Sequence, residues 1–408
     1  MGKIKTYKLG DIVNVLDYKR IPLSSTQRQN KKGIYPYYGA QGIIDYIDDY
    51  IFDGEYLLIA EDGENLKSQK QHVAQIAKGK YWVNNHAHIV ESNGLCDIRY
   101  VCYLLNRMDL SGYITGSAQP KLNQANLLKI EIKLPSLKEQ YKIAEFLHLF
   151  DDKIEINRRI NENLEQQAQA LFKSWFVDFE PFKDGKFVDS ELGMIPEGFN
   201  IKYIGDIPHT IESGRRPKGG ATDKGVPSIG AENIKGLGVY DYSKTKYIPK
   251  EFALTTNRGK INGYELLIYK DGGKPGYFIP NYTIFGDGFP FENMFINEHV
   301  FKLDLLNKEY NIFAYFYMQT PFIMNQLNSI GGKAAIPGIN TKDVESLPIF
   351  SYENNKIKEF GNIVLPMIKR ILKNCRENSR LAQLRDTLLP KLMSGELKLS
   401  EIETKLDE

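Results

Sequence analysis

The sequence is poor in cysteine and contains no long apolar run. Its three cysteines among 408 residues, Cys96, Cys102 and Cys375, form no CxxC pair, which argues against a disulfide framework and against a cysteine zinc site. The sequence shows neither a cleavable signal pattern nor an apolar stretch of about 18 residues, the features that mark secreted and membrane proteins. We therefore expect a reduced, cytoplasmic protein without a membrane span.

Motifs of several enzyme classes are also missing. No two of the 18 prolines are adjacent, so the Asn/Asp-Pro-Pro-aromatic loop of adenine-N6 methyltransferases cannot occur. No GxxxxGK[ST] phosphate loop exists, and the glycine-rich stretch from Asp271 to Gly276 has the wrong spacing for one, so we interpret it as a turn. These absences exclude the usual nucleotide-driven motor and a self-contained adenine methyltransferase.

Two weaker patterns suggest metal chemistry but are incomplete. Glu131-Ile132-Lys133, with Asp109 upstream, is similar to the end of a metal-dependent nuclease motif, yet short Glu-x-Lys strings are common by chance. His86 and His88 alternate as zinc ligands on a strand would, but no third ligand is near them in sequence. We interpret both as structural, and we predict that the chain is not an enzyme by itself and binds no metal or other cofactor.

The charge is small in total and uneven in distribution. The net charge of +2 is too low for a general polyanion binder, because such proteins are usually strongly basic. Residues 136–180 carry nine acidic and six basic residues, whereas residues 19–32 hold five basic residues and no acidic one. Nucleic-acid binding would therefore have to come from local basic segments.

Residues 1–135 are predicted to form a β-rich α+β domain. Short β-branched or aromatic runs separated by Gly, Asp and Asn predict strands at Ile34–Gly39, Gly42–Ile47, Glu55–Ala60 and Ala87–Val90. The basic segment just before the first of these strands offers phosphate-binding charges beside side chains that can reach base edges. A solvated loop with ordinary tyrosine packing is the plainer alternative.

Much of this first domain recurs later in the chain. The echoes are Ile204–Ile207 for Leu9–Ile12, Gly225–Ala231 for Gly33–Ala40, Asn262–Ile268 for Asp53–Ile59, and His299-Val300 for His88-Ile89. A second basic segment, Arg215 to Lys224, again precedes the Gly-Ala strand. Asn123 and Asn340 lie 217 positions apart, and so long a period indicates tandem domain duplication because solenoid repeats are far shorter.

A long helix is predicted after each copy. In the first helix, apolar residues recur at alternating steps of four and three from Ile143 to Trp175, and about 40 helical residues would extend about 60 Å. The second helix carries a rougher stripe from Ile357 to Leu392. There, Gly361 and Pro366 are predicted to kink or delay the helix, and Pro390 to end it near Leu389.

These observations predict an α+β chain made of four segments. They are a β-rich domain at 1–135, a spacer helix at 136–179, a second β-rich domain at 180–346 that starts with a Pro/Gly linker, and a second helix with the C-terminal tail at 347–408. The two helices are expected to pack antiparallel as a coiled-coil spacer with pseudo-two-fold symmetry. Such a pseudo-dimer suits two DNA half-sites separated by a fixed gap.

The helical regions resemble those of a known family. The stretch LPSLKEQYKIAEFLHLFDDKIEINRRINENLEQQAQALFKSWFVDFEPF, the segment ELGMIPEGF and the C-terminal LAQLRDTLLPKLMSGEL are similar to conserved regions of specificity subunits of Type I restriction–modification systems. The order of domains and helices also matches. The resemblance implies that each β-rich domain is a target recognition domain for one half of a bipartite, asymmetric DNA sequence, and that the helices set the spacing.

The resemblance also implies partners and cofactors. Two adenine-N6 methyltransferase subunits would dock on the helices, and restriction/translocase subunits would join through them. S-adenosylmethionine would belong to the methyltransferase, and Mg and ATP to the restriction subunits, with none bound by this chain. Trp175 and Phe176 at one end, and Leu388 to Leu392 at the other, are candidates for methyltransferase contact.

No base contact can be transferred from the family, because recognition domains diverge with their targets. Charge and placement instead nominate candidates for DNA binding in both domains. They are Lys19, Arg20, Arg28, Lys31, Lys32, Gln41, Lys67, Lys70, Gln119, Lys121, Arg215, Arg216, Lys218, Lys224, Lys270, Lys274 and Lys333. Gln119 and Lys333 each lie in a Gly-containing loop just before a long helix.

Two alternatives remain open from sequence. One is a coiled-coil assembly protein whose domains bind protein partners. The other is an orphan specificity subunit that serves methylation without restriction.

Overall fold

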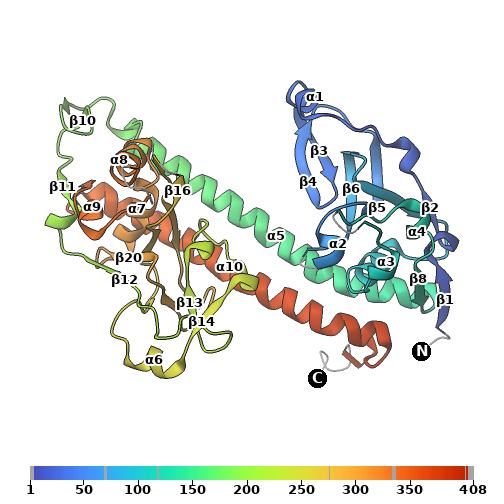
Figure 1. The fold of residues 1–408 in the computed structure, drawn as a ribbon. Helices are drawn as coiled ribbons and strands as arrows, with labels where there is room; N and C mark the ends of the chain where they lie inside the picture. The colour runs from blue at the N-terminus through green and yellow to red at the C-terminus, as the bar shows by residue number, and fades with distance from the viewer. Residues whose placement is uncertain are drawn as a thin grey trace. The chain divides into compact units, whose positions relative to one another are not determined.

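The computed structural model of the chain describes residues 4–68, 71–116, 119–274, 276–332, 337–399 and 401–402. The chain forms two compact units. Unit 1 comprises Met1–Asp152 and Ala382–Glu408, and unit 2 comprises Lys153–Leu381. The boundaries fall within two long helices, so each unit holds one β-rich domain together with a segment of both helices (Figure 1).

Unit 1 is organised around a mixed sheet with the strand order β2-β7-β5-β6-β3-β4. Its strands are β2 Val13–Val15, β3 Lys32–Gly39, β4 Gly42–Ile47, β5 Phe52–Ala60, β6 Ala74–Val83 and β7 Ala87–Ser92. The strands predicted from β-branched and aromatic runs are thus confirmed. Strand β5 lies between β6 and β7, and its C-terminal half is fully buried.

Short helices and a separate strand pair complete unit 1. The strands β1 (Lys5–Lys8) and β8 (Glu131–Leu134) pair antiparallel. The helices are η1 Leu9–Asp11, η2 Asp17–Lys19, α1 Ser25–Gln29, α2 Asn65–Ser68, α3 Ile98–Leu105, η3 Ser111–Tyr113 and α4 Gln124–Leu127. Because strand side chains alternate between faces, Leu57 and Ile59 join the core under α3, whereas Leu58 joins a second cluster on the other face.

Unit 2 repeats this plan with two smaller sheets, ordered β12-β20-β15-β18 and β14-β13-β19. The strands are β12 Thr210–Ser213, β13 Val226–Ile229, β14 Lys246–Ile248, β15 Leu266–Tyr269, β18 Asn281–Ile284, β19 Phe295–Ile296 and β20 Val300–Asp304. The short pairs are β9 Phe187–Val188 with β10 Ile195–Pro196, β11 Ile201–Tyr203 with β21 Pro348–Phe350, and β16 Gly273–Lys274 with β17 Tyr277–Phe278. The helices are η4 Glu180–Phe182, η5 Ile204–Asp206, η6 Ala231–Asn233, η7 Tyr242–Lys244, α6 Lys250–Thr255, α7 Lys308–Tyr317, α8 Pro321–Gly331 and α9 Thr341–Glu345.

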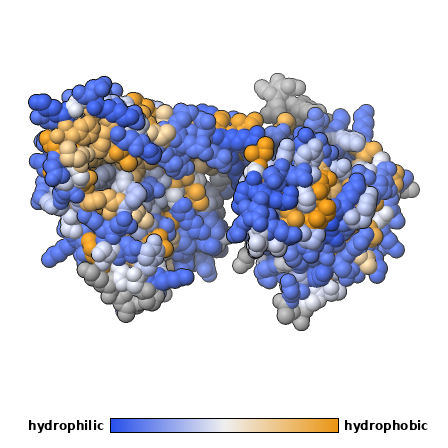
Figure 2. Space-filling view, turned by 90° about the horizontal axis from the view of Figure 1, so that it is seen from above, coloured by the Kyte–Doolittle hydropathy of each residue, from blue (hydrophilic) through white to orange (hydrophobic). Residues whose placement is uncertain are grey.

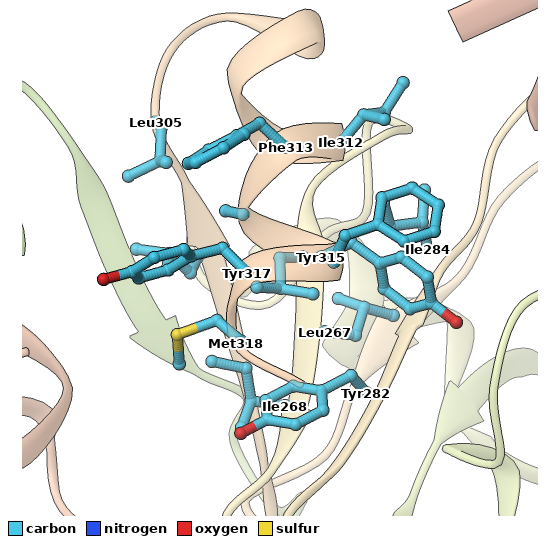
Figure 3. Packing of buried hydrophobic residues seen from close by; sticks show 14 of the residues in the cluster. Leu267, Ile268, Tyr282, Ile284, Leu305, Ile312, Phe313, Tyr315, Tyr317 and Met318 are labelled. Carbon is cyan, nitrogen blue, oxygen red and sulfur yellow. The ribbon is translucent and has the colours of Figure 1, made fainter. Parts of the chain in front are cut away.

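The core of unit 2 forms where α7 meets β15 and β18. Figure 3 shows Tyr315 and Tyr317 of α7 near side chains of these strands, including Leu267 and Ile284, and Phe313 beside Leu305. All residues of α7 from Tyr310 to Tyr317 are buried, so this helix is enclosed rather than amphipathic. The outer surface is different, because hydrophilic side chains cover most of the face seen in Figure 2.

The strand registers confirm the duplication of the two β-rich domains. In unit 1, Leu57 of β5 lies opposite Val90 of β7. In unit 2, Leu266 of β15 lies opposite Leu303 of β20 in the same antiparallel arrangement. The predicted match of Asp53–Ile59 with Asn262–Ile268 therefore places equivalent residues on equivalent central strands.

The register corrects one predicted match, that of His88 with His299. Ala60 faces Ala87 at the end of the β5–β7 ladder, and Tyr269 faces Val300 at the end of the β15–β20 ladder. The residue before each of these partners is a histidine, so His299 corresponds to His86. Matching the two short His-Ile/Val strings by residue type shifted the alignment by two residues. A shift of two keeps each side chain on the same face of the strand, so the alternation of buried and exposed residues did not reveal the error.

The two long helices are α5 (Leu137–Phe176) and α10 (Asn355–Ser394), each 40 residues long. In unit 2 they run antiparallel, because Asn157 bonds Asn378 whereas Asn161, further along α5, bonds Asn374. In unit 1, Asp151 near the start of α5 forms an ion pair with Arg385 near the end of α10. The predicted intramolecular packing of the two helices is confirmed within each unit.

The predicted delay of the second helix and its predicted end near Leu389 are wrong. Helix α10 continues through Gly361, Pro366 and Pro390 to Ser394. Pro390 lies between Leu389 and Leu392, which are 3% and 1% exposed. Because buried apolar contacts of this kind hold both sides of the proline, packing offsets the lost hydrogen bond and the helix does not end there.

Gly361 is needed for close packing rather than for a kink. A Cβ at this position would lie 2.8 Å from the Cα of Glu309 and closer still to its Cβ. Alanine is favoured over glycine by about 1 kcal/mol in a helix interior, but overpacking against backbone costs about 1–3 kcal/mol. We expect Gly361→Ala to destabilise the protein by about 1–2 kcal/mol, measured by urea unfolding.

The exposed neighbour Asn362 provides a matched control for this substitution. Asn362→Ala adds the same helix propensity without a clash, so its stability should equal or slightly exceed that of the wild type. A stabilised Gly361→Ala variant would show that α10 can move away from Glu309 at no cost.

The apolar seam of α5 is wider than predicted near the C-terminal end. Leu171 and Trp175, the predicted seam residues, are half-buried and pack against the unit 2 core. Phe172 and Phe176 lie beside them and are buried more deeply, each 5% exposed. Phe176 was also expected to be an exposed contact for a partner, as were Leu389 and Leu392, and all three are buried. The globular part of unit 2 packs against α5 beside α10, which widens the buried face beyond a two-helix seam.

Candidate functional site

An Asp–His pair lies on the surface of unit 1 where β5 ends and β7 begins. Antiparallel pairing of β5 with β7 brings Asp62 and His86 together, because each lies just beyond the paired residues. His86 Nδ1 and Asp62 Oδ2 are 2.7 Å apart. The backbone N–H of His86 donates to Asn84 Oδ1 at 2.8 Å, which fixes the turn. The histidine side chain is 49% exposed.

The same pair occurs at the matching place in unit 2. Asp271 follows β15, His299 precedes β20, and His299 Nδ1 lies 2.7 Å from Asp271 Oδ2. Asn297 Oδ1 accepts the backbone N–H of His299 at 2.9 Å, and the histidine side chain is 50% exposed. Both units thus have the Asn-x-His sequence, the aspartate that contacts the histidine, and the same exposure of the histidine side chain.

An arginine stands beside each pair at matching positions. Val15 of β2 faces Val90, and Ile211 of β12 faces Leu303, so Arg20 and Arg216 each lie five residues beyond equivalent strand residues. Arg20 Nη1 donates to the carbonyl of Asn85 at 3.3 Å. Arg216 Nη1 lies 3.6 Å from Oε1 of Glu298 and is 70% exposed.

Arg20, unlike Arg216, is held inside the fold. Its side chain is 16% exposed and pairs with Asp17 at 3.2 Å and Glu61 at 2.8 Å, and it also donates to the carbonyl of Ala87 at 3.0 Å. Burial would raise the pKa of Glu61, but its bonds to Arg20 and Lys121 and the nearby His88 outweigh burial and lower it. This geometry speaks against Arg20 as a DNA contact and gives it a structural role.

His88 is a buried member of the same network. It is 1% exposed, and its two ring nitrogens lie 2.6 Å from Asp17 Oδ2 and 2.7 Å from the carbonyl oxygen of Leu122. Both partners carry acceptor oxygens, so each ring nitrogen of His88 is held by a contact within the protein. His86 and His88 therefore bind different carboxylates, and the zinc-pair pattern has no structural basis.

A loop before α4 or α9 closes each site. The backbone N–H of Leu122 donates to the carbonyl of Glu61 at 2.8 Å, and that of Ile339 donates to Lys270 at 2.9 Å. Lys121, 53% exposed, reaches Glu61 at 3.2 Å. Gln119 is exposed in the first loop, whereas Lys333, nominated in the second loop, lies outside the described residues.

Gln41 belongs to the unit 1 site as well. Its Nε2 donates to Asn65 Oδ1 at 3.2 Å, and a Cβ at Gly63 would lie 3.3 Å from the same nitrogen. Lys67 is exposed on α2, and Lys70 lies outside the described residues. Of the predicted residues in unit 1, the structure brings Arg20, Gln41, Gln119 and Lys121 together.

The remaining candidates of unit 1 lie elsewhere. Arg28 and Lys32 pair with Asp45 of β4 at 3.2 and 2.5 Å, and Lys31 pairs with Asp48 at 3.4 Å. The bonds from Lys32, from the backbone of Tyr46 and from Arg28 lower the pKa of Asp45. These three basic residues and their two aspartate partners thus form a separate charged group around the β3–β4 hairpin. Lys19 is exposed next to the Tyr18 ring.

Most of the DNA-binding candidates in unit 2 have exposed side chains. Arg215, Lys218, Lys224 and Lys274 are exposed. Lys270 places its ammonium 4.9 Å from the ring centre of Phe301. Arg215 and Arg216 follow Gly214, whose N–H donates to the carbonyl of Asn297 at 3.1 Å, so the backbone ties this basic segment to the Asp271–His299 pair.

Residues around the two pairs differ between the units. Asn84 N–H donates to Tyr38 and Asn297 N–H to Ile229, so Gln41 matches Glu232 three residues further on. By the same registers, the remaining matched positions hold different residues in the two units: Glu61 and Lys270, Asn85 and Glu298, and Lys121 and Gly338. The site therefore combines a constant Asp–His pair and a matched arginine with other neighbours that differ between the units.

Sequence reasoning missed both Asp–His pairs as site residues. The available signal was the Asn-x-His string at 84–86 and 297–299, which recurs after the repeated strands. It was hidden by the wrong match of His88 with His299.

Among the described residues, the nuclease-like and zinc-like patterns of the sequence do not come together as a metal site. Within that part of the chain, no three His, Cys, Asp or Glu side chains are grouped to hold a metal ion. Asp109 accepts the backbone N–H of Ser111 at 2.9 Å, and its hydrogen bonds to Ser111 lower its pKa. Glu131 and Lys133 lie on β8 as ordinary strand residues.

Comparison with known proteins shows similarity to Type I specificity subunits. A family model for the Type I restriction modification DNA specificity domain matches residues 1–166. The Type I restriction enzyme MjaIX specificity subunit of Methanocaldococcus jannaschii is 29% identical over 344 residues, covering 80% of this chain and 75% of that protein. The chain is therefore similar to Type I specificity subunits along most of its length. A putative Type I specificity subunit of Haemophilus influenzae is 36% identical over 146 residues, covering 36% of this chain and 37% of that protein.

The fold agrees with this family. The crystal structure of a Type I S subunit from M. genitalium matches with a TM-score of 0.60 at 16% identity, covering 96% of each chain. The predicted α+β fold of a duplicated β-rich domain and long helix is therefore confirmed. In the described part of the chain, no helix combines the length and apolar character that crossing a membrane requires.

Proposed function

We propose that this protein is the DNA-specificity subunit of a Type I restriction–modification complex, and that unit 1 and unit 2 each read one half of a bipartite target. The observation that carries the proposal is the duplicated site, with an exposed Asp–His pair at the same strand ends in both units. A constant pair with variable neighbours suits two half-sites that share a backbone but differ in sequence.

The exposed charges support DNA as the ligand. Arg215, Arg216 and Lys218 lie on the surface of unit 2, and Arg216 reaches Glu298, which also lies near His299. Cations supply phosphate contacts, and polar side chains supply base contacts in a groove.

The helices are proposed to fix the spacing between the half-sites. In unit 2 their seam contains buried Asn157 and Asn374, both fully enclosed. Asn157 donates to Asn378 at 2.8 Å, and Asn374 donates to Asn161 at 2.8 Å. Buried polar pairs of this kind specify register in helix seams, because any slip leaves them unpaired.

Catalysis is assigned to partner subunits. Two adenine-N6 methyltransferase subunits with S-adenosylmethionine, and restriction/translocase subunits with Mg and ATP, would act around this chain, which alone would be non-catalytic and cytoplasmic. The direct test combines the purified chain with its methyltransferase subunit and maps methylated bases. We expect adenine methylation at one bipartite sequence from the mixture and none from either protein alone.

Salt dependence tests the DNA contacts of unit 2. Replacing Arg215, Arg216 and Lys218 together with glutamine should reduce the slope of log affinity against log salt by about 2–3, since each phosphate contact contributes about 0.9. The same triple change at Lys369, Arg370 and Lys373, exposed on α10, should leave the slope unchanged. Equal slopes for both triple variants would favour the scaffold alternative, in which these domains bind protein.

A further inference from the structure

We propose that the Asp62–His86 and Asp271–His299 pairs are two copies of one phosphate anchor, each holding the DNA backbone of its half-site through the imidazole Nε2. This inference rests on the proposed DNA-specificity function and assigns a role to residues for which sequence reasoning gave none. It separates the two tasks of each site, since the anchor positions the DNA and the neighbours read it.

The duplication kept the residues of the Asp–His pair and changed the residues that flank it. The aspartate, the histidine and the supporting asparagine are identical in both units, with the same 2.7 Å Asp–His distance. The flanking positions changed from Gln41 to Glu232 and from Glu61 to Lys270. The two halves of an asymmetric target differ in bases and share only the sugar–phosphate backbone, so the unchanged pair matches the shared element.

The hydrogen-bonding chemistry of the exposed imidazole ring suits a phosphate oxygen. A carboxylate that accepts Nδ1–H sets the ring orientation and directs Nε2 away from the aspartate, and in an imidazolium ring Nε2 also carries a hydrogen that it can donate. Within the described residues, Nε2 of His86 makes no hydrogen bond, and Nε2 of His299 has Glu298 Oε1 at 3.7 Å, beyond hydrogen-bond distance. A phosphate oxygen is an acceptor suited to this donor.

The neighbouring His88 shows the exposure and the contacts of a purely structural histidine in this fold. His88 is 1% exposed and both of its nitrogens are bonded within the protein. His86 and His299 are about half exposed and use one nitrogen each. Their exposure and their unused donor are the features that distinguish a ligand contact from a packing contact.

The acidic side chains near each ring do not preclude an approaching phosphate. Glu61 is paired with Arg20 at 2.8 Å and Lys121 at 3.2 Å. Glu298 is shared between Arg216 at 3.6 Å and His299 at 3.7 Å. Cations thus offset the carboxylates around both pairs, and Arg216 and Lys121 remain exposed enough to add attraction.

The experiment measures binding of the complete complex of this chain with its methyltransferase subunits to its target DNA across a series of salt concentrations. His86→Ala and His299→Ala should each reduce the salt slope by about 0.9, and the double variant by about 1.8. The methylated sequence should stay the same. His86→Lys, which supplies a cation at the same position, should retain most of the slope.

His148 on α5 is the matched control. It also pairs with an aspartate, Asp152 at 3.3 Å, and its side chain is 32% exposed, but it lies outside the duplicated site. His148→Ala should leave the slope and the target unchanged. Circular dichroism and the melting temperature check the folding of each variant, and His86→Gln replaces His86→Ala where alanine alters the fold.

Two results would overturn the anchor. An unchanged slope in the double variant rules out a phosphate contact, and a changed methylated sequence makes the histidines base readers instead. Failure of the proposed function is distinguishable, because the wild-type complex would then show no sequence-specific binding at all.

Discussion

Phe172→Ala is expected to lower the free energy of unfolding of unit 2 by about 3–5 kcal/mol. Phe172 is 5% exposed and its ring centre lies within 5.5–5.9 Å of Phe176, Phe313, Phe316 and Phe360. It therefore joins α5, α7 and α10 in one aromatic cluster. Truncation removes the transfer energy of the ring and leaves a cavity that three helices cannot all close.

Urea unfolding followed by tryptophan fluorescence measures this loss, since Trp175 lies on the same helix, one residue before Phe176. Ile156→Ala is the control, because Ile156 lies on the unit 2 part of α5 and is 52% exposed. Its effect should stay within about 0.5 kcal/mol. A loss below about 1 kcal/mol for Phe172→Ala would show that the cluster collapses around the missing ring.

Arg20→Met is expected to cost about 3 kcal/mol of stability, because it leaves the part-buried carboxylates of Asp17 and Glu61 without their shared cation. Lys19, the exposed neighbour, is the control, and Lys19→Met should change stability by less than about 0.5 kcal/mol. A folded Arg20→Met complex with normal stability and a reduced DNA salt slope would contradict the structural role of Arg20.

The cost of Arg20→Met should depend on pH. In the wild type, the pKa of Glu61 lies below its ordinary value of 4.5, so its ionised form stabilises the fold above that pH, and this contribution is lost as pH falls through the lowered value. Removing Arg20 takes away one of the contacts that lower the pKa of Glu61, so that pKa is higher in the variant than in the wild type. The difference in stability between variant and wild type should therefore be largest near neutral pH and shrink below about pH 4.

The sequence was sufficient for the elements and for the duplication. Alternating β-branched and aromatic residues predicted Gly42–Ile47 and Ala87–Val90, and both are strands. The seam after Leu137 predicted a helix of about 40 residues, and α5 has that length. These features depend on residues close in the chain, and local periodicity records them well.

Predictions that depended on distant contacts fared less well. Pro390 was expected to end the second helix, but buried Leu389 and Leu392 carry α10 past it. Phe176 was expected to face a partner, but the aromatic cluster of unit 2 buries it. In both cases tertiary packing outweighed a local rule, as it does whenever apolar burial exceeds the cost of a single backbone feature.

By itself, the sequence determined that this protein is a duplicated β-rich domain and helix, and it identified the basic segments where DNA contacts were to be sought. Only the tertiary structure decided which charged and polar groups face outward. Arg20 and Arg216 look alike in sequence, yet one is 16% and the other 70% exposed. His86 and His88 differ in the same way, because burial and pairing depend on strands and loops that meet from distant parts of the chain.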